Sequence, residues 1–164
     1  MEVLVLFGSE SDMEVGAEIV KLFDAFGIRH ALHIASAHRT PEKVGRLVKK
    51  AEKEGAKAII AGAGLSAHLA GVVASKTLLP VIGIPVAGGP LNGLDALLST
   101  VNMPGGVPVA TVSMGKAGGK NAALLAARII ALARPDVLKK LESYRDEQAR
   151  AVEEADKRIN AGRR

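Results

Sequence analysis

Five short apolar runs alternate along the chain with longer segments of helical periodicity, and this alternation is the strongest constraint on the fold. The runs span residues 3–7, 28–35, 57–61, 81–84 and 107–113. Successive positions in each run are apolar, as in strands of a parallel sheet that is covered by helices on both faces. The alternation therefore predicts an α/β protein, a three-layer αβα sandwich around a parallel, flavodoxin-like sheet with strand order 2-1-3-4-5.

Helices are expected between these runs and after the last one, at 12–26, 41–54, a short stretch ending near 75, 94–101, 121–133 and 136–160. Gly27 is expected to end the first helix, and Pro41 to begin the second, where its missing N–H costs nothing. No linker, repeat or low-complexity segment interrupts the pattern. We expect a single domain over residues 1–164, with a core of 1–133 and a C-terminal helix within 134–164.

Two helices suggest self-association. Residues 122–130 are apolar nearly all round, which implies burial on more than one side. The C-terminal helix has too few apolar residues to form a core of its own, so we expect it to pack on a neighbouring subunit. A frayed terminal helix is the alternative interpretation.

The composition excludes several classes of protein. Aliphatic side chains must form the core, because 48% of the residues are hydrophobic but only three Phe and one Tyr are aromatic. The lack of cysteine excludes disulfides, thiolate nucleophiles and cysteine-ligated metals. The start of the chain does not resemble a signal peptide, and no apolar stretch approaches the roughly 20 residues of a membrane span. We expect a cytoplasmic protein with no membrane partner.

The basic net charge does not indicate nucleic-acid binding. The formal charge is +5, but basic and acidic residues are interleaved, and aromatic residues for base stacking are scarce. The histidines show no i,i+4 spacing and no carboxylate cluster, so a metal site is not supported. Neither the Rossmann nor the Walker glycine pattern occurs. We therefore expect no metal site and no dinucleotide or Walker-type ATP binding.

Small and polar residues follow the first apolar run, where a strand ends and a helix begins. Gly8 allows a ligand to approach the backbone, and the hydroxyls of Ser9 and Ser11 lie at a helix N-terminus, where anions bind. Asp12 can accept hydrogen bonds from sugar hydroxyls. The segment is typical of an anion or ribose cradle, although Ser11 or Asp12 acting only as a helix cap is the alternative.

The second run ends in the segment from Ser36 to Pro41. Thr40 supplies the expected cap of the next helix, which leaves His38 and Arg39 without a role in folding. An arginine matches phosphate geometry, and a histidine exchanges protons near neutral pH. These residues favour a phosphorylated small molecule beside a proton-transfer histidine. A solvated loop residue is the alternative for His38.

A third loop, residues 62–68 with Gly64, Ser66 and His68, follows the third run at the same edge of the sheet. In the expected strand order, the loops after the first and third strands flank the crevice in which ligands bind. His68 either faces the ligand or lies on a buried helix turn, whereas His30 and His33 are expected to be structural. Two glycine-rich segments, 88–93 and 103–106, either close over a substrate or form turns.

Taken together, these motifs resemble the PurE family. The resemblance runs from about residue 3 to residue 132 and rests on segments 8–12, 36–41, 61–64, 67–69, 79–83, 103–111 and 121–126. Arg39 and segment 67–69 resemble the mutase branch of the family, whereas Ser66, Ala70 and segment 87–90 depart from its usual pattern.

The resemblance implies an enzyme of de novo purine synthesis that converts N5-carboxyaminoimidazole ribonucleotide to 4-carboxy-5-aminoimidazole ribonucleotide without a cofactor. A carboxylase of aminoimidazole ribonucleotide that uses free CO2, or a non-catalytic ribonucleotide-binding protein, is the alternative. The resemblance also implies a homo-oligomer, an octamer, with His38 as general acid and base. The substrate-binding residues that it implies are Ser9, Ser11, Asp12, Ser36 and Arg39. Gly64 and His68 of the third loop are further candidates for substrate binding.

Overall fold

The five predicted strands form one parallel sheet in the computed structural model, which describes residues 1–161. They are β1 (Val3–Phe7), β2 (His30–Ile34), β3 (Ala58–Ala63), β4 (Val81–Pro85) and β5 (Ala110–Thr111). Their order is β2-β1-β3-β4-β5, which confirms the flavodoxin-like topology. Because all neighbours are parallel, the loops that follow the strands lie at one edge of the sheet.

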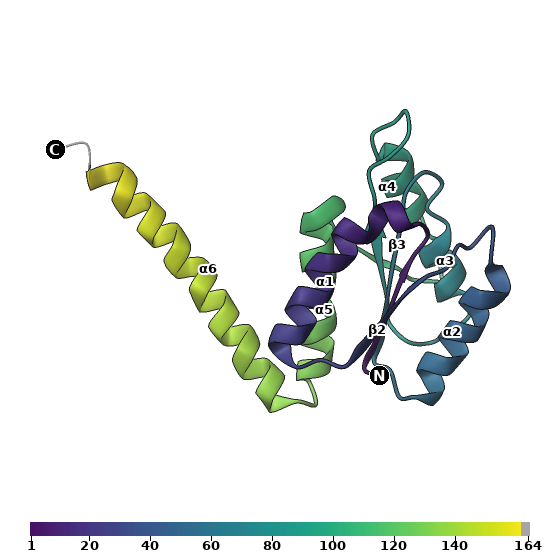
Figure 1. Ribbon diagram of the computed structural model, residues 1–164, viewed down its shortest axis with the longest axis horizontal. Coiled ribbons are helices and arrows are strands. Elements are labelled where there is room, and N and C mark those ends of the chain that lie inside the picture. Colours follow the sequence, from purple (N-terminus) through teal and green to yellow (C-terminus); the bar gives the residue numbers. More distant parts are fainter. Residues whose placement is uncertain (162–164) are drawn as a thin grey trace.

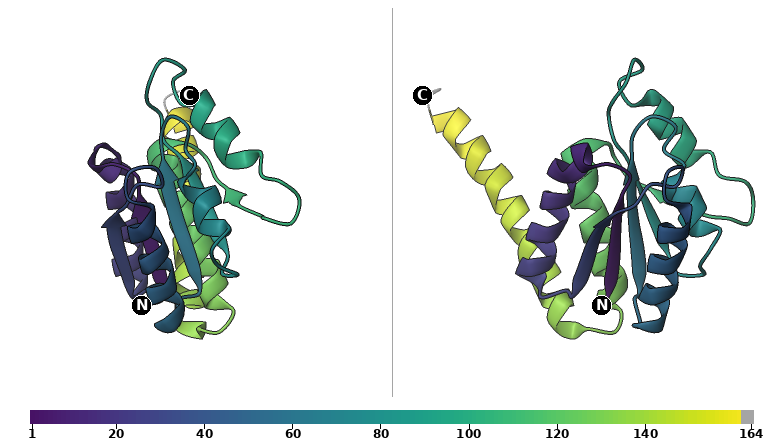
Figure 2. Two further views of the ribbon diagram at one scale, coloured as in Figure 1. Left: turned by 90° about the vertical axis from the view of Figure 1, so that its right-hand side faces the viewer. Right: turned by 45° about the vertical axis from the view of Figure 1, so that its right-hand side comes forward.

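Helices cover both faces of the sheet (Figures 1 and 2). They are α1 (Met13–Phe26), α2 (Pro41–Lys53), α3 (Leu69–Ala74), α4 (Leu94–Val101), α5 (Gly115–Ala131) and α6 (Pro135–Ala161). α1 and α5 lie on one face, α2 and α3 lie on the other, and α4 packs on β4. Within residues 1–161, no helix is long and apolar enough to cross a membrane.

The central strand β1 is buried along its whole length and contributes to a core on each face. Val3, Val5 and Phe7 pack with α1 and α5, and Leu4 and Leu6 pack with α2 and α3. Complete burial of such a side chain stabilises the fold by about 1.5–3 kcal/mol. The predicted aliphatic core is therefore two cores, separated by the sheet.

α5 begins well before the predicted residue 121. The added residues include Gly118 and Gly119, and close packing requires both glycines. A Cβ on Gly118 would lie 1.8 Å from the carbonyl oxygen of Ser113, and a Cβ on Gly119 would lie 2.7 Å from that of Val15. The sheet, α1 and α6 of the same protomer cover the helix. The predicted burial of this helix on more than one side is therefore confirmed, and within this protomer the sheet, α1 and α6 provide it.

β5 is much shorter than the predicted strand over 107–113. It lies at the edge of the sheet, with β4 as its one neighbouring strand. Pro108 has no N–H to donate to a strand ladder, and proline is confined to such edges. The ladder therefore forms only over Ala110–Thr111.

α6 leaves the rest of the protomer after its first turns (Figure 1). Val137 is fully buried, and Tyr144 meets Phe26 of α1 edge-on, with ring centroids 6.0 Å apart. Farther along the helix, Val152 and Ile159 are 70% and 65% exposed. Residues 162–164 of the expected C-terminal helix lie outside the described residues.

Arg134, in the turn before α6, connects this helix to the start of β1. Its Nη1 donates to both carboxylate oxygens of Glu2 (3.0 and 3.1 Å) and to the carbonyl of Gly27 (3.2 Å), and its Nη2 donates to Asp136. Glu2 is buried and also accepts a bond from the N–H of Arg29 (3.0 Å). Burial raises the pKa of Glu2, but the hydrogen bonds and charges of the two arginines outweigh it and lower the pKa.

Arg134→Met is expected to lower the temperature of thermal unfolding, because it leaves the buried Glu2 carboxylate with fewer partners. Since the pKa of Glu2 is lowered in the folded state, its contribution to stability is present above the unfolded pKa and is lost as pH falls through the folded pKa. Denaturant unfolding at neutral and acid pH should show the effect of the substitution shrinking in acid. Arg128→Met, on the exposed side of α5, is the control. Equal losses in both variants would contradict this role of Arg134.

Candidate active site

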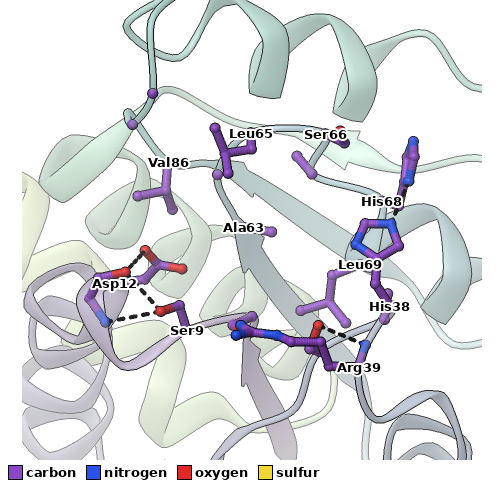
Figure 3. Close-up of a pocket in the computed structure, with 18 of the residues that line it drawn as sticks. Ser9, Asp12, His38, Arg39, Ala63, Leu65, Ser66, His68, Leu69 and Val86 are labelled. Carbon is purple, nitrogen blue, oxygen red and sulfur yellow. Dashed lines mark hydrogen bonds between the residues drawn. The ribbon is translucent and has the colours of Figure 1, made fainter.

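All the predicted site residues line one pocket at the carboxyl edge of the sheet (Figure 3). Its volume is about 650 Å³, within the range of small-molecule sites. Its walls come from the loops that follow β1 to β4, at residues 8–12, 36–39, 63–69 and 86–89. The other glycine-rich segment, 103–106, does not line this pocket.

The loop after β1 is closed by its own serines. Ser9 Oγ accepts a hydrogen bond from the N–H of Ser11 (3.3 Å) and so caps the short 3-10 helix Glu10–Asp12. The Ser11 hydroxyl lies 2.9 Å from Ser9 Oγ and 3.0 Å from Asp12 Oδ1. Asp12 stands at the start of α1, but its side chain caps no N–H of that helix. Helix capping therefore explains the role of the Ser9 side chain, but it does not explain why a carboxylate stands at position 12.

The Asp12 carboxylate is buried in the wall of the pocket, with 7% of the residue exposed. Burial raises the pKa of Asp12, and the hydroxyl of Ser11 and the backbone of Ser9 offset part of that rise. A carboxylate has two oxygens with several acceptor positions. Asp12 can therefore accept further hydrogen bonds from a hydroxylated ligand.

Thr40 closes the loop after β2. Its Oγ1 accepts from the N–H of Ser36 (2.9 Å) and donates to the carbonyl of Ser36 (3.2 Å). Thr40 occupies the cap position of α2, but its side chain caps no helical N–H, so the predicted capping role is wrong. Pro41 begins the helix as predicted. The closed turn carries His38 and Arg39 at the edge of the pocket.

Arg39 joins the first two loops. Its Nη2 donates to the carbonyl of Gly8 (3.2 Å), and its backbone N–H donates to Ser36 Oγ (3.2 Å). The side chain extends toward Ser9 (Figure 3). A guanidinium has five N–H donors, so the contact with Gly8 leaves most of them for an anion.

His38 and His68 form a hydrogen-bonded pair. His38 Nε2 lies 2.8 Å from His68 Nδ1, although the residues are 30 positions apart. The ring planes are inclined at 77° (Figure 3). The sequence left open whether His68 faces a ligand or is buried in a helix, and the structure places it in the pocket.

The loop after β3, which carries His68, is conformationally strained. Leu65 (φ 54°) and Ala67 (φ 29°) have left-handed backbone, at a cost of about 1–3 kcal/mol each for residues other than glycine. Gly64 passes close to the end of β4, because a Cβ there would lie 3.1 Å from the carbonyl oxygen of Val86. This part of the pocket therefore has a defined shape that the neighbouring strand maintains.

Sequence reasoning missed the apolar wall of the pocket. Leu65, Leu69 and Val86 line it (Figure 3), and no polar motif marked them. Their one signal was their position beside glycine-rich strand ends. Gly62, in contrast, is a packing residue of β3, because a Cβ there would lie 2.3 Å from the ring of Phe7.

Outside the pocket, His30 has the predicted structural role. Its Nδ1 lies 3.0 Å from the carbonyl oxygen of Ile28, and its ring packs against Phe23.

Within the pocket, the guanidinium of Arg39 and the serine hydroxyls can bind a phosphate. The carboxylate of Asp12 can accept hydrogen bonds from sugar hydroxyls, and His38 can exchange protons with a ligand. The arrangement fits a phosphorylated small molecule whose reacting atoms lie beside an imidazole.

Known proteins resemble this chain over nearly its whole length. The sequence model of the family described as AIR carboxylase matches residues 2–151. The N5-carboxyaminoimidazole ribonucleotide mutase of Pyrococcus horikoshii is 50% identical over 94% of this chain and 86% of that protein. The mutase of Bacillus subtilis is 46% identical over 92% and 93%, and that of Escherichia coli is 43% identical over 92% and 89%.

The fold has an equally extensive match. The crystal structure of Treponema denticola PurE superposes with a TM-score of 0.86 at 35% sequence identity. The match covers 96% of this chain and 97% of that one. The similarity therefore extends over nearly the whole fold.

Asp12→Asn is expected to raise the temperature of thermal unfolding at neutral pH. Because the pKa of Asp12 is raised in the folded state, the folded protein binds the proton more tightly, and the contribution of this group to stability falls as pH rises. The neutral amide removes that penalty, so in thermal unfolding the gain should be larger at neutral pH than at a pH below the ordinary pKa of an aspartate carboxyl. Glu10→Gln, an exposed neighbour, is the control. A lower unfolding temperature for Asp12→Asn at neutral pH would refute this prediction.

Proposed function

The chain belongs to the AIR carboxylase family, and we infer that it is an N5-carboxyaminoimidazole ribonucleotide mutase of purine synthesis in which His38 is the general acid and base. The observation that carries the role of His38 is its place beside Arg39 on one closed turn. Both side chains line the same pocket as Asp12. A proton-transfer group, an anion-binding group and an acceptor for sugar hydroxyls therefore surround one cavity.

The reaction moves a carboxylate from the exocyclic nitrogen of the substrate to ring carbon C4. Protonated His38 delivers a proton to that nitrogen while its bond to the carboxylate carbon breaks and CO2 is released. C4 then attacks the CO2, and neutral His38 removes the proton from C4. The histidine ends in its starting state. Such acid–base catalysis contributes typically about 10²–10⁴-fold.

Arg39 and Asp12 orient the substrate in this proposal. The phosphate binds Arg39 with the hydroxyls of Ser9 and Ser36, and the ribose hydroxyls donate to Asp12. The bond from Arg39 to the carbonyl of Gly8 supports this placement, because it holds the guanidinium between the first two loops. Phosphate and ribose held in this way bring the imidazole ring of the substrate toward His38.

The apolar wall retains the released CO2 beside the ring. Leu65 and Val86 line the pocket, and Gly89 packs against Leu65 so closely that a Cβ would lie 2.4 Å from Cδ2 of that leucine. An apolar cover over the reacting atoms excludes water and limits loss of an intermediate. Retention of CO2 therefore requires segment 86–89, which contributes Val86 and Gly89 to this apolar cover.

The enzyme is also proposed to be a cytoplasmic homo-oligomer, an octamer. What supports association is α6, whose outer part carries the exposed side chains Val152 and Ile159 and lies away from its own protomer (Figure 2). On α4, Leu94 and Leu98 are 52% and 49% exposed. A second copy of the chain that packs on these surfaces would bury them.

His38→Asn should lower turnover strongly and retain binding. We expect wild-type protein to convert N5-carboxyaminoimidazole ribonucleotide without added bicarbonate, and the variant to lose at least about 10²-fold in kcat. Its affinity for the product, measured by calorimetry, should stay within a few-fold. His33→Asn, on β2 outside the pocket, is the control and should keep full activity.

Parallel assays with both substrates separate the alternatives. Turnover only of aminoimidazole ribonucleotide with CO2 would instead support a carboxylase, the reaction after which the family is described. Binding without turnover of either substrate would support a ribonucleotide-binding protein. Unchanged turnover in His38→Asn would remove this histidine from the mechanism.

Light scattering is expected to give a mass that is a multiple of the 17.0 kDa protomer, eightfold for the octamer. Val152→Glu should shift the assembly toward smaller species, because it places a charge on the apolar side of α6. Glu153→Gln changes an adjacent charged position and is the control. A monomeric wild-type protein would overturn the proposed assembly.

A further inference from the structure

We propose that His68 is a positioning residue that acts through His38 by fixing which of its nitrogens carries a proton. The proposal rests on the proposed function, because it assigns a role within that reaction. The sequence had placed His68 among the substrate contacts. Its contact with His38 gives it a different role.

The contact occupies one nitrogen of each ring. His38 Nε2 and His68 Nδ1 lie 2.8 Å apart, a hydrogen-bond distance that holds one proton between them. Two N–H groups cannot face one another at this distance. When His38 is protonated on both nitrogens, its Nε2–H therefore donates to His68 Nδ1, and His68 carries its own proton on Nε2.

This arrangement makes Nδ1 the nitrogen of His38 that exchanges protons with the substrate. Protonated His38 gives its Nδ1 proton to the exocyclic nitrogen of the substrate and keeps the Nε2 proton on His68. The bare Nδ1 then accepts the proton from C4. Without His68, neutral His38 can instead hold its proton on Nδ1, and in that tautomer Nδ1 cannot accept.

No carboxylate orients His38 in this way. Among the described residues that line the pocket, Asp12 is the one carboxylate, and its hydrogen-bond partner there is Ser11. In many enzymes the orienting partner of a catalytic histidine is a carboxylate or a carbonyl. Here the geometry gives that role to a second imidazole.

The loop after β3 is built to hold His68 in place. The strained residues Leu65 and Ala67 immediately precede it, and the N–H of Ala67 donates to the carbonyl of Gly64 (3.1 Å). The carbonyl of His68 accepts from the N–H of Val72 in α3 (2.9 Å). Backbone strain persists where the surrounding structure imposes it, typically at functional sites.

A matched pair of variants tests the proposal. His68→Asn places an amide oxygen near the position of Nδ1, where it can accept from His38, whereas His68→Leu has the same shape without an acceptor. We expect His68→Leu to lower kcat about 10- to 100-fold with KM within a few-fold, and His68→Asn to restore most of kcat. If His68→Leu does not fold, His68→Gln replaces it, because its longer side chain carries the amide past this position.

A double-mutant cycle with His38→Asn separates an action through His38 from a direct contact with substrate. If His68 acts through His38, adding His68→Leu to His38→Asn should lower kcat no further. Additive losses, equal losses in His68→Leu and His68→Asn, or a change confined to KM would overturn the proposal while leaving the function intact. A wild-type protein without mutase turnover would overturn the proposed function as well.

Discussion

The parallel register of β1 with both of its neighbours is the constraint on which the site depends. Phe7 at the end of β1 pairs with Ile34 of β2 and with Gly62 of β3, so the three strands end at one level. The loops that follow them are therefore adjacent, which brings His38 and His68 together. A shift of one residue would turn every side chain of β1 to the opposite face, and the two cores of alternate β1 residues prevent it.

The pocket contains features that lower the stability of the folded protein, and the two cores offset them. Asp12 is a buried carboxylate whose pKa is raised, and Leu65 and Ala67 hold left-handed backbone. Each feature is unfavourable for folding by itself. Together they set an acceptor and an imidazole at defined positions around the cavity, which is the use that binding sites make of strain and perturbed ionisation. The sheet beneath them is apolar and fully buried at β1, so it holds the loops in place.

The fold and most of the site were predictable because their signals are local. Apolar runs identified the strands, and polar residues at strand ends identified the loop from Ser9 to Asp12 and the loop with His38 and Arg39. The signals failed where tertiary packing decides the outcome. The start of α5 was placed too late, because Gly118 and Gly119 allow close packing of a helix there. The bond between His38 and His68 joins two loops, and no spacing in the chain indicates it.

A crystal structure of the protein with 4-carboxy-5-aminoimidazole ribonucleotide bound tests the proposed roles of Arg39 and His38 most directly. We predict that the phosphate contacts Arg39 and that C4 of the ring lies about 3 Å from His38 Nδ1, within reach for proton transfer. His38 Nε2 should remain hydrogen-bonded to His68. A phosphate bound away from Arg39, or a ring outside the reach of His38, would contradict these roles.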